Sequence, residues 1–312
     1  MADARHILTY DLIDKLGEGP SGIVWRAWDR ALERFVVVKI LSAKRSADPL
    51  IQEYAIPTLT RLTYINHPNV AQVFDCQMVE DRLVIVAQEI PGTPITALTA
   101  EAPLSSDKLL DLAAQICEGL RSVHTRELVH GNLKPSNIIV DSSGRVRLTD
   151  FGLVTGMDDS SLNRNRVTAD SMRYQSPERV QNNAPTVESD LFSLGAVLYE
   201  LGTGLQAFPG EIETHVAQAI LYDEPNAEIL HERDIPPEIR LLILKALSKK
   251  PEDRYSSVAE LLCTIRGILE YHRSLERPEK PRERTATPRQ YLMVSLLCIL
   301  LLIWWVVITT PK

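Results

Sequence analysis

The chain has 312 residues, of which 45% are hydrophobic and 24% are charged. This composition suits a folded protein with one large domain, or with two lobes that share a core. The formal net charge is −7 and no strongly basic domain is present, so we expect no nucleic-acid partner.

Short apolar runs rich in β-branched residues fill the chain before about residue 92, which is typical of sheet strands. Residues 35–41 and 83–87 are the clearest of these runs. Lys39 ends the first run, about twenty residues after a cluster of glycines. Such a lysine is either a strand end that reaches solvent or a group that reaches a nucleotide's phosphates.

The glycine cluster has the pattern G-x-G-x-x-G-x-V, formed by Gly17, Gly19, Gly22 and Val24. Residues without side chains let a backbone close over phosphates and offer amide donors. The flanking apolar residues and the strand that follows favour a β-hairpin over a Rossmann turn, which would open into a helix.

Helical periodicity begins at about residue 105, with Ser105 or Ser106 as the N-cap. Apolar residues then recur at three- and four-residue spacing, at Leu109, Leu112, Ile116, Leu120 and Val123. A hairpin is expected at residues 138–148, around the turn at 141–144, and the chain to about residue 271 is expected to be helical again.

The four cysteines are far apart and show no metal-ligand spacing. Three of them lie in apolar or helical surroundings, so we expect buried free thiols and a reducing compartment. They are Cys76, Cys117, Cys263 and Cys298.

The C-terminal part of the chain combines a linker with an apolar segment. Residues 272–290 are dense in Pro, Arg and Glu and are expected to be an extended linker, whereas residues 291–310 carry no charge. The segment is almost wholly apolar and has the length of about 20 residues that a membrane-spanning helix needs, and a hydrophobic docking helix is the alternative. Six basic residues precede the segment and only Lys312 follows it, which predicts a single-pass anchor with the larger part cytoplasmic.

Five further motifs occur in a fixed order. They are LVHGNLKPSNII at 128–139, LTDFGL at 148–153, YQSPE at 174–178, SDLFSLG at 189–195 and KPEDR at 250–254. Together with the glycine pattern, they make residues 8 to 271 resemble the eukaryotic-type (Hanks-type) Ser/Thr protein kinase family, including its membrane-anchored bacterial members. A eukaryotic tail-anchored protein stays open as an alternative source.

The resemblance implies an α+β, two-lobed protein-kinase fold with one C-terminal transmembrane helix. The β-rich N-lobe would cover residues 8–91 and the helical C-lobe residues 92–271. The resemblance also implies that Arg254 pairs with Glu178.

The resemblance further implies a site for ATP and Mg²⁺. Asn137 and Asp150 would ligate magnesium, which bridges phosphate oxygens. The remaining nucleotide-binding residues would be the three glycines over the phosphates, Lys39 on the α- and β-phosphates, Val24, Val37 and Ile139 around the adenine, and Gln88 to Ile90 as the hinge.

The catalytic loop departs from the family pattern. The family reads His-Arg-Asp, whereas this chain reads His130-Gly131-Asn132. Asn132 stands at the position of the catalytic aspartate, and Lys134 is the other catalytic residue that the resemblance assigns. A neutral amide can orient a hydroxyl but cannot accept its proton, and general-base assistance is worth roughly 10²–10⁴-fold.

Gly131 replaces the arginine that in many relatives grips a phosphate on the activation loop. Control through that arginine by a phosphorylated Thr168 or Ser171 is therefore not expected. Ser171 is still expected to contact the catalytic loop, as the matching family threonine does.

The glutamate that normally pairs with the lysine is also missing. The usual spacing places Thr58 there, with Leu62 in the expected apolar position four residues later. Glu53 is the nearest carboxylate, five residues before Thr58, and Pro57 would break the helix between these two residues. Unless a local insertion shifts the register, we expect no Lys–Glu pair.

Ala87 falls at the position that gates the back of the adenine pocket. It is either a small core residue or the opening of a pocket for bulky ligands.

Three hypotheses follow for function. The first is a membrane-anchored pseudokinase that binds ATP and magnesium and acts as a signalling scaffold or allosteric regulator, with protein partners that the sequence does not identify. The second is a weakly active Ser/Thr protein kinase that uses Asn132 in place of the aspartate. The third is a kinase fold with no ligand.

Overall fold

The computed structural model describes residues 6–19, 22–49, 51–151 and 169–276. The elements in chain order are β1 (His6–Ile7), β2 (Tyr10–Gly19), β3 (Gly22–Asp29), β4 (Arg34–Leu41), α1 (Ala43–Ser46), the π-helical turn η1 (Ile51–Ala55), α2 (Ile56–Leu62), β5 (Val73–Val79), β6 (Arg82–Gln88), β7 (Gly92–Pro94), the 3₁₀ turn η2 (Ile95–Thr99), α3 (Ser106–His124), η3 (Pro135–Asn137), β8 (Ile138–Asp141), β9 (Val146–Leu148), α4 (Ala169–Met172), α5 (Pro177–Val180), α6 (Val187–Thr203), α7 (Glu213–Tyr222), α8 (Ala227–Glu232), α9 (Pro237–Ala246), η4 (Pro251–Asp253) and α10 (Val258–Glu276).

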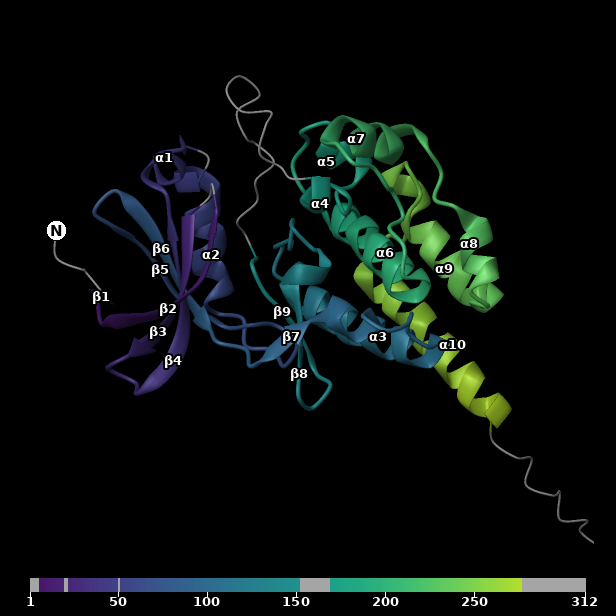
Figure 1. The fold of residues 1–312 in the computed structure, drawn as a ribbon, viewed down its shortest axis with the longest axis horizontal. Coiled ribbons are helices and arrows are strands. Elements are labelled where there is room, and N and C mark those ends of the chain that lie inside the picture. Colours follow the sequence, from purple (N-terminus) through teal and green to yellow (C-terminus); the bar gives the residue numbers. More distant parts are fainter. Residues whose placement is uncertain (1–5, 20–21, 50, 152–168, 277–312) are drawn as a thin grey trace, which may run out of the picture. The chain divides into compact units, whose positions relative to one another are not determined.

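The N-lobe is an antiparallel sheet with the strand order β1-β2-β3-β4-β6-β5, with α2 packed beside β5 (Figure 1). The strands predicted at residues 35–41 and 83–87 are β4 and β6. Because side chains alternate along a strand, β4 buries Val36 and Val38 in the sheet's own core and turns Val37 and Lys39 to the opposite face. This alternation positions the candidate site.

The C-lobe is built around α3 and α6, which pack against each other (Figure 1). The five apolar residues predicted as the stripe of α3 are all at most 1% exposed. The N-cap position is Ser105, although its side chain makes no capping hydrogen bond. α6 is buried on nearly every side, as expected for a helix that is apolar all round.

The predicted hairpin at 138–148 is formed by β8 and β9, and β7 adds a third strand to it. Its turn is held by the carboxylate of Asp141, which accepts hydrogen bonds from the backbone N–H groups of Ser143 and Arg145. Gly144 has φ +78°, a conformation that favours glycine.

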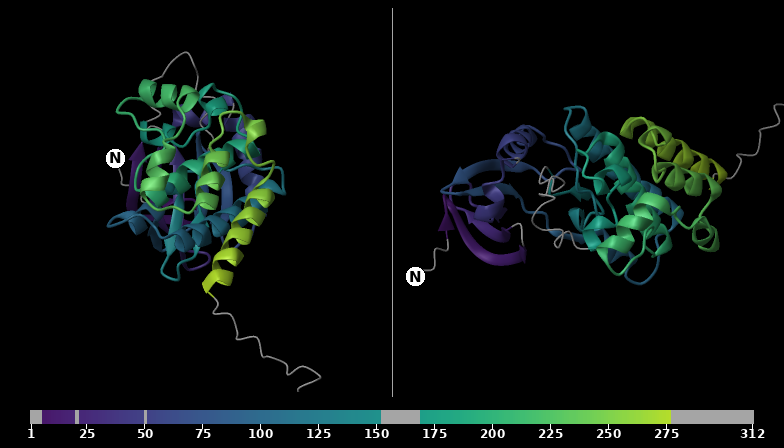
Figure 2. Two further views of the ribbon diagram at one scale, coloured as in Figure 1. Left: turned by 90° about the vertical axis from the view of Figure 1, so that its right-hand side faces the viewer. Right: turned by 90° about the horizontal axis from the view of Figure 1, so that it is seen from above.

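Viewed from above, the strands β1 to β6 gather in one lobe and the larger helices in the other (Figure 2). The lobes are linked by backbone hydrogen bonds, from Ala71 N–H to the Leu148 carbonyl and from Leu148 N–H to the Asn69 carbonyl. The two-lobed fold predicted from the sequence is therefore correct.

The cysteine prediction holds only in part. Cys117 is fully buried in α3 and Cys76 is half-buried in β5, but Cys263 is exposed. It lies on the solvent face of α10, while its neighbours Leu262 and Ile265 face the core. Cys298 lies outside the described residues.

The membrane segment predicted at residues 291–310, and all of the linker beyond Glu276, also lie outside the described residues. Within the part of the chain that the structure describes, none of the helices has the length and apolar character needed to span a membrane.

Candidate active site

The glycine pattern folds as the predicted β-hairpin. β2 and β3 pair directly up to Gly19 and Gly22, with Gly17 opposite Val24. A Cβ on Gly22 would lie 2.1 Å from the carbonyl oxygen of Ile40, and its φ is +143°. At Gly17 and Gly19, by contrast, a Cβ would meet no atom within 4 Å. The pairing of β3 with β4 therefore requires glycine at position 22. At Gly17 and Gly19 the backbone is not covered by any side chain of the described residues.

Strand register gathers the candidate phosphate and adenine residues on one face of the N-lobe sheet. Val24 lies directly across from Lys39, and Val37 occupies the same face two residues before Lys39. On the other side of β4, Ile85 pairs with Lys39 and Ala87 pairs with Val37. The cationic side chain is therefore surrounded by small and branched apolar groups.

The hinge candidates follow directly from β6. Gln88 ends the strand and donates its backbone N–H to the Gln72 carbonyl, and Glu89 and Ile90 are half-buried. Ile139 lies on the partly exposed face of β8, which it shares with Asp141, whereas Ile138 and Val140 enter the core. Ala87 is partly exposed rather than enclosed in the core.

Lys39 forms an ion pair with Asp150, with 3.5 Å between Nζ and Oδ1. Among the described residues no glutamate lies within ion-pair distance of Lys39. Asp150 has φ +59°, and its side chain is 44% exposed, so the carboxylate is reached by solvent as well as by Lys39.

The helix that should carry the missing glutamate explains the absence. The π-helical turn Ile51–Ala55 runs directly into α2, and Pro57 lies in the first turn of α2. A proline in the first turn is tolerated because its missing N–H has no partner there. The predicted break at Pro57 is therefore wrong: the chain changes from a π-helical turn to an α-helix before Pro57 and stays helical to Leu62, with Glu53 exposed and Thr58 half-buried.

Asp190 of α6 holds the catalytic loop in place. Its buried carboxylate accepts hydrogen bonds from the backbone N–H groups of His130 (2.7 Å) and Gly131 (2.8 Å), and it contacts His124 Nε2 at 2.8 Å. Burial opposes the charged form, but the contact with His124 and the loop backbone outweigh it and hold the pKa of Asp190 below its ordinary value.

The loop residues then fall into two hydrogen-bonded pairs. Asn137 donates its side-chain amide to the Asn132 carbonyl at 2.8 Å, which ties the candidate magnesium ligand to the degenerate catalytic position. Lys134 Nζ donates to Ser171 Oγ at 2.9 Å, so the predicted contact between Ser171 and the catalytic loop is confirmed. Thr168 lies outside the described residues.

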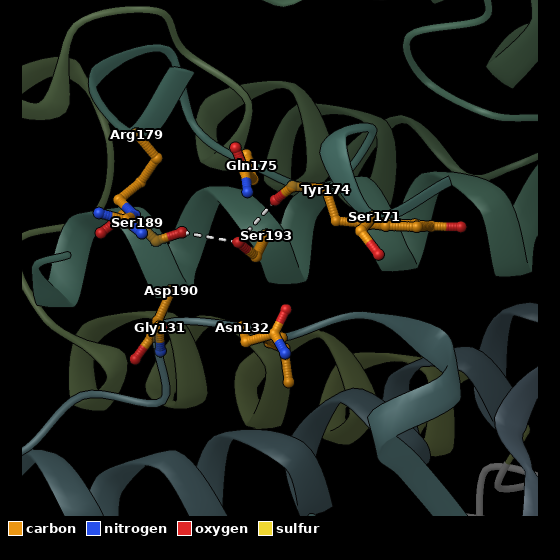
Figure 3. A pocket seen from close by; sticks show the side chains of 10 residues that line it. Gly131, Asn132, Ser171, Tyr174, Gln175, Arg179, Ser189, Asp190 and Ser193 are labelled. Carbon is orange, nitrogen blue, oxygen red and sulfur yellow. Dashed lines mark hydrogen bonds between the residues drawn. The ribbon is translucent and has the colours of Figure 1, made fainter. Parts of the chain in front are cut away.

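A small polar pocket lies where this loop meets the segment before α5 and the start of α6 (Figure 3). It is lined by Gly131, Asn132, Leu133, Ser171, Tyr174, Gln175, Arg179, Ser189, Asp190 and Ser193. One wall is fixed by Ser193 Oγ, which donates to the Tyr174 carbonyl and lies 3.0 Å from the Ser189 carbonyl. Asn132 and Ser171 both line this pocket.

The predicted pair of Glu178 and Arg254 is confirmed. The two carboxylate oxygens accept from Nη1 and Nη2 at 2.8 and 2.9 Å, a two-pronged arrangement. Burial alone would raise the pKa of Glu178, but the hydrogen bonds and charge of Arg254 lower it below its usual value. The pair fixes α5 against the chain that precedes α10.

The donor set suits the predicted nucleotide and cation. Mg²⁺ prefers oxygen ligands and usually takes one or two protein carboxylates together with substrate phosphates and water. The carboxylate of Asp150 and the amide of Asn137 are such donors, and Lys39 would balance phosphate charge. Among the described residues no cluster of three or more His, Cys, Asp or Glu side chains forms a metal site without a nucleotide.

Two residues of this region were not singled out from the sequence. Asp190 carries a signal, since it is an acid that directly precedes the apolar run of α6 that begins at Leu191. Arg179 carries none, because its surroundings come from segments about fifty residues earlier and ten residues later.

The family described as protein kinase domain matches residues 10–264. Serine/threonine-protein kinase PrkC of Bacillus subtilis is 28% identical over 269 residues, which are 86% of this chain and 42% of PrkC. Serine/threonine-protein kinase PknB of Mycobacterium leprae is 30% identical over 292 residues, which are 92% of this chain and 46% of PknB. The chain spans less than half the length of these curated relatives.

Solved structures show the same fold. The PknI kinase domain of Mycobacterium tuberculosis matches with a TM-score of 0.67 at 19% identity, covering 86% of this chain and 99% of that one. Rad53 1–466 in complex with AMP-PNP matches with a TM-score of 0.65 at 23% identity, covering 81% and 64%.

Proposed function

Since this chain belongs to the protein kinase domain family and has bacterial Ser/Thr kinases as homologues, we propose that it is a membrane-anchored pseudokinase. It binds ATP with Mg²⁺ and acts as a signalling scaffold or allosteric regulator. The observation that carries the proposal is the presence of Asn132 at the position of the catalytic aspartate, while the two candidate magnesium ligands, Asn137 and Asp150, are kept.

Nucleotide binding is supported by the grouping of charges in the cleft. Lys39 and Asp150 already contact each other, and bound Mg²⁺–ATP would give each of them a stronger opposite charge, the phosphates for one and the cation for the other. The bare surface over Gly17 and Gly19 leaves room for phosphates. Bound nucleotide would supply the phosphoryl group and the metal's remaining ligands.

Loss of efficient transfer follows from the chemistry of the amide. Asn132 can hold a substrate hydroxyl by a hydrogen bond, yet it cannot accept the proton that leaves when oxygen attacks phosphorus. Without the Lys–Glu pair, Lys39 is also positioned only by Asp150 among the described carboxylates. The loss of the base at Asn132 and the loss of the Lys–Glu pair both lower the rate of phosphate transfer more than the affinity for ATP.

A weakly active Ser/Thr kinase is the second candidate. It is favoured by the contact of Lys134 with Ser171, because a cation beside the acceptor position can stabilise developing phosphate charge. Positioning and metal charge supply most of the catalysis in phosphoryl transfer, so the loss of one base slows the reaction without abolishing it.

Calorimetry with the full chain in detergent tests nucleotide binding. We expect saturable ATP binding that requires Mg²⁺, and at least about tenfold weaker binding in both Lys39→Ala and Asp150→Ala. Glu53→Ala is the matched control, because Glu53 is exposed and takes no part in the proposed site. Absence of Mg²⁺-dependent ATP binding in the unmodified chain would contradict the nucleotide-binding part of the proposal and favour a kinase fold with no ligand.

A further inference from the structure

Arg26 lies on the face of the N-lobe sheet that carries the candidate nucleotide residues. Its neighbours in β3, Trp25 and Ala27, pack in the sheet's own core on the other face. Because side chains alternate along a strand, Arg26 shares its face with Val24, and the register of β3 and β4 places it directly across from Val37. Arg26 is therefore a direct neighbour of the two residues that are expected above the adenine.

The guanidinium of Arg26 joins this face of the sheet to the hinge. Its Nε donates to Oε1 of Glu89 at 2.6 Å, and Glu89 is the middle residue of the predicted hinge, Gln88 to Ile90. The side chains of Arg26 and Glu89 are 32% and 27% exposed, so the contact is partly shielded from solvent. A hydrogen bond between two charged groups is shorter and stronger than one between neutral groups.

Two further contacts hold the guanidinium in this orientation. Its central carbon lies 3.6 Å from the ring centroid of Phe35 in β4, and the Phe35 ring packs edge-on against Trp28 with 4.8 Å between centroids. Its Nη1 lies 3.6 Å from Oδ2 of Asp14 in β2. Stacking on an aromatic ring suits the planar guanidinium and restricts its motion. The single side chain of Arg26 therefore connects β2, β3 and β4 with the hinge.

The hinge is also held by its own backbone. Gln88 donates its N–H to the Gln72 carbonyl at 2.8 Å, and the next residue, Glu89, is held by Arg26. Consecutive hinge residues are thus fixed to the segment before β5 and to β3. A binding site that is held in place before its ligand arrives loses less conformational freedom on binding, which raises affinity.

We propose that the ion pair of Arg26 and Glu89, here called the hinge latch, fixes the residues above the adenine relative to the hinge. Arg26 and Glu89 are then positioning residues for an adenine nucleotide, and neither needs to touch it. When the latch is broken, a smaller fraction of the chain has the arrangement that binds, and the observed affinity decreases by that fraction. This inference rests on the proposed function, because it concerns how the same site takes up ATP.

The latch and a simple effect of charge predict different results. Arg26→Gln removes a positive charge and Glu89→Gln removes a negative one, whereas the nucleotide with its magnesium ion is anionic. If only the local field mattered, Arg26→Gln would weaken ATP binding and Glu89→Gln would strengthen it. The latch predicts that both variants weaken ATP binding, and that the double variant is no weaker than either single one, because both changes break the same contact.

The test is calorimetry of Mg²⁺–ATP binding to the full chain in detergent, at constant ionic strength. We expect Arg26→Gln and Glu89→Gln each to bind ATP roughly three- to tenfold more weakly than the unmodified chain, between the effects of an exposed ion pair and of a shielded one. The affinity of the double variant should lie within about twofold of the single variants. If Arg26→Gln does not fold, Glu89→Gln decides alone, since the two explanations predict opposite signs for it.

Arg34→Gln is the matched control. Arg34 of β4 also lies near a carboxylate, with 3.6 Å between its Nε and Asp29 Oδ2, and its guanidinium lies 3.6 Å from the ring centroid of Phe74. Phe74 packs against the sheet's own core, on the face opposite Arg26. Arg34→Gln therefore removes the same kinds of contact from the same sheet, and it should bind ATP as the unmodified chain does.

A second measurement needs no nucleotide. Amide hydrogen exchange of residues 88–92 in the nucleotide-free chain should be faster in Arg26→Gln and in Glu89→Gln than in the unmodified chain and in Arg34→Gln, because the hinge opens more often. Unchanged exchange in both latch variants would overturn the proposal. So would ATP binding by Glu89→Gln that is as tight as that of the unmodified chain.

The failure of the latch can be told apart from the failure of the proposed function. If the unmodified chain binds no ATP, the proposed function is wrong, and the role of the latch in nucleotide uptake is wrong with it. If the unmodified chain binds ATP and Glu89→Gln binds it equally well, the latch alone is wrong and the nucleotide-binding proposal stands.

Discussion

At the scale of single residues, one carboxylate organises the catalytic loop. Asp190 accepts from the backbone of His130 and Gly131 and contacts the ring of His124, so three parts of the loop region share one buried charge. Gly131 has φ +70°, which a glycine adopts without strain. The loop therefore keeps a kinase-like path although two of its three signature residues have changed.

His130 should make stability depend on pH. It is 0% exposed and packs against Phe151 with 4.3 Å between ring centroids and 39° between the ring planes. Burial lowers the pKa of His130, although the charges of Asp190 and Asp150 oppose the shift. Because the unfolded chain takes up this proton first, at about pH 6.5, the stabilisation is complete above that pH and is lost as the pH falls toward the folded pKa.

We expect the free energy of unfolding in urea to decrease from about pH 7 to pH 5. His130→Asn should flatten this decrease, because the amide oxygen can replace Nδ1 as the acceptor for Asn132 N–H but does not titrate. Part of the slope should remain, since burial also lowers the pKa of His67. An unchanged slope in His130→Asn would contradict the assignment.

At the scale of elements, the β2–β3 hairpin contains one glycine that its packing requires, Gly22, and one that it does not, Gly19. Gly22→Ala should destabilise the N-lobe by about 1–3 kcal/mol, because the new Cβ collides with the Ile40 carbonyl and the backbone is held at φ +143°. Gly19→Ala is its matched control and should cost much less, since a Cβ there meets no atom within 4 Å. Urea unfolding of both variants measures the difference. Equal losses would show that the hairpin does not depend on close packing at Gly22.

How far the sequence predicts an element depends on whether its signal is local. The apolar stripe of α3 and the apolar β-branched run of β4 lie within single elements, and the structure has a helix and a strand there as predicted. The π-helical turn before α2 was not predicted, because sequence periodicity does not distinguish it from an α-helix broken at Pro57. In the site, the register that places Val37 and Lys39 on one face was readable from alternation.

Contacts between segments that are distant in the sequence could not be predicted from the residues alone. Nothing near Arg179 in the sequence indicates that Gly131 and Asp190 lie beside it, and the pairing of Lys39 with Asp150 joins two lobes. The Glu178–Arg254 pair and the Ser171 contact were predicted only because the family resemblance supplied them.

At the scale of the whole molecule, the anchor is proposed from the sequence of residues 291–310. The full chain should sediment with membranes and be released by detergent but not by salt, because a spanning helix is held by hydrophobic burial rather than by charge. A variant that ends before residue 291 should remain in the supernatant. Recovery of the full chain in the supernatant, with no detergent present, would rule out the anchor.

The central claim is that the site is assembled but lacks its base. The most direct measurement is phosphate transfer and ADP production from labelled ATP with Mg²⁺, using the full chain in detergent beside Asn132→Asp and Asp150→Ala. The account predicts little or no turnover by the unmodified chain and turnover that is roughly 10²–10⁴-fold higher in Asn132→Asp. It predicts no turnover by Asp150→Ala. Clear turnover by the unmodified chain that disappears in Asp150→Ala would contradict the pseudokinase assignment and establish an enzyme that works with Asn132.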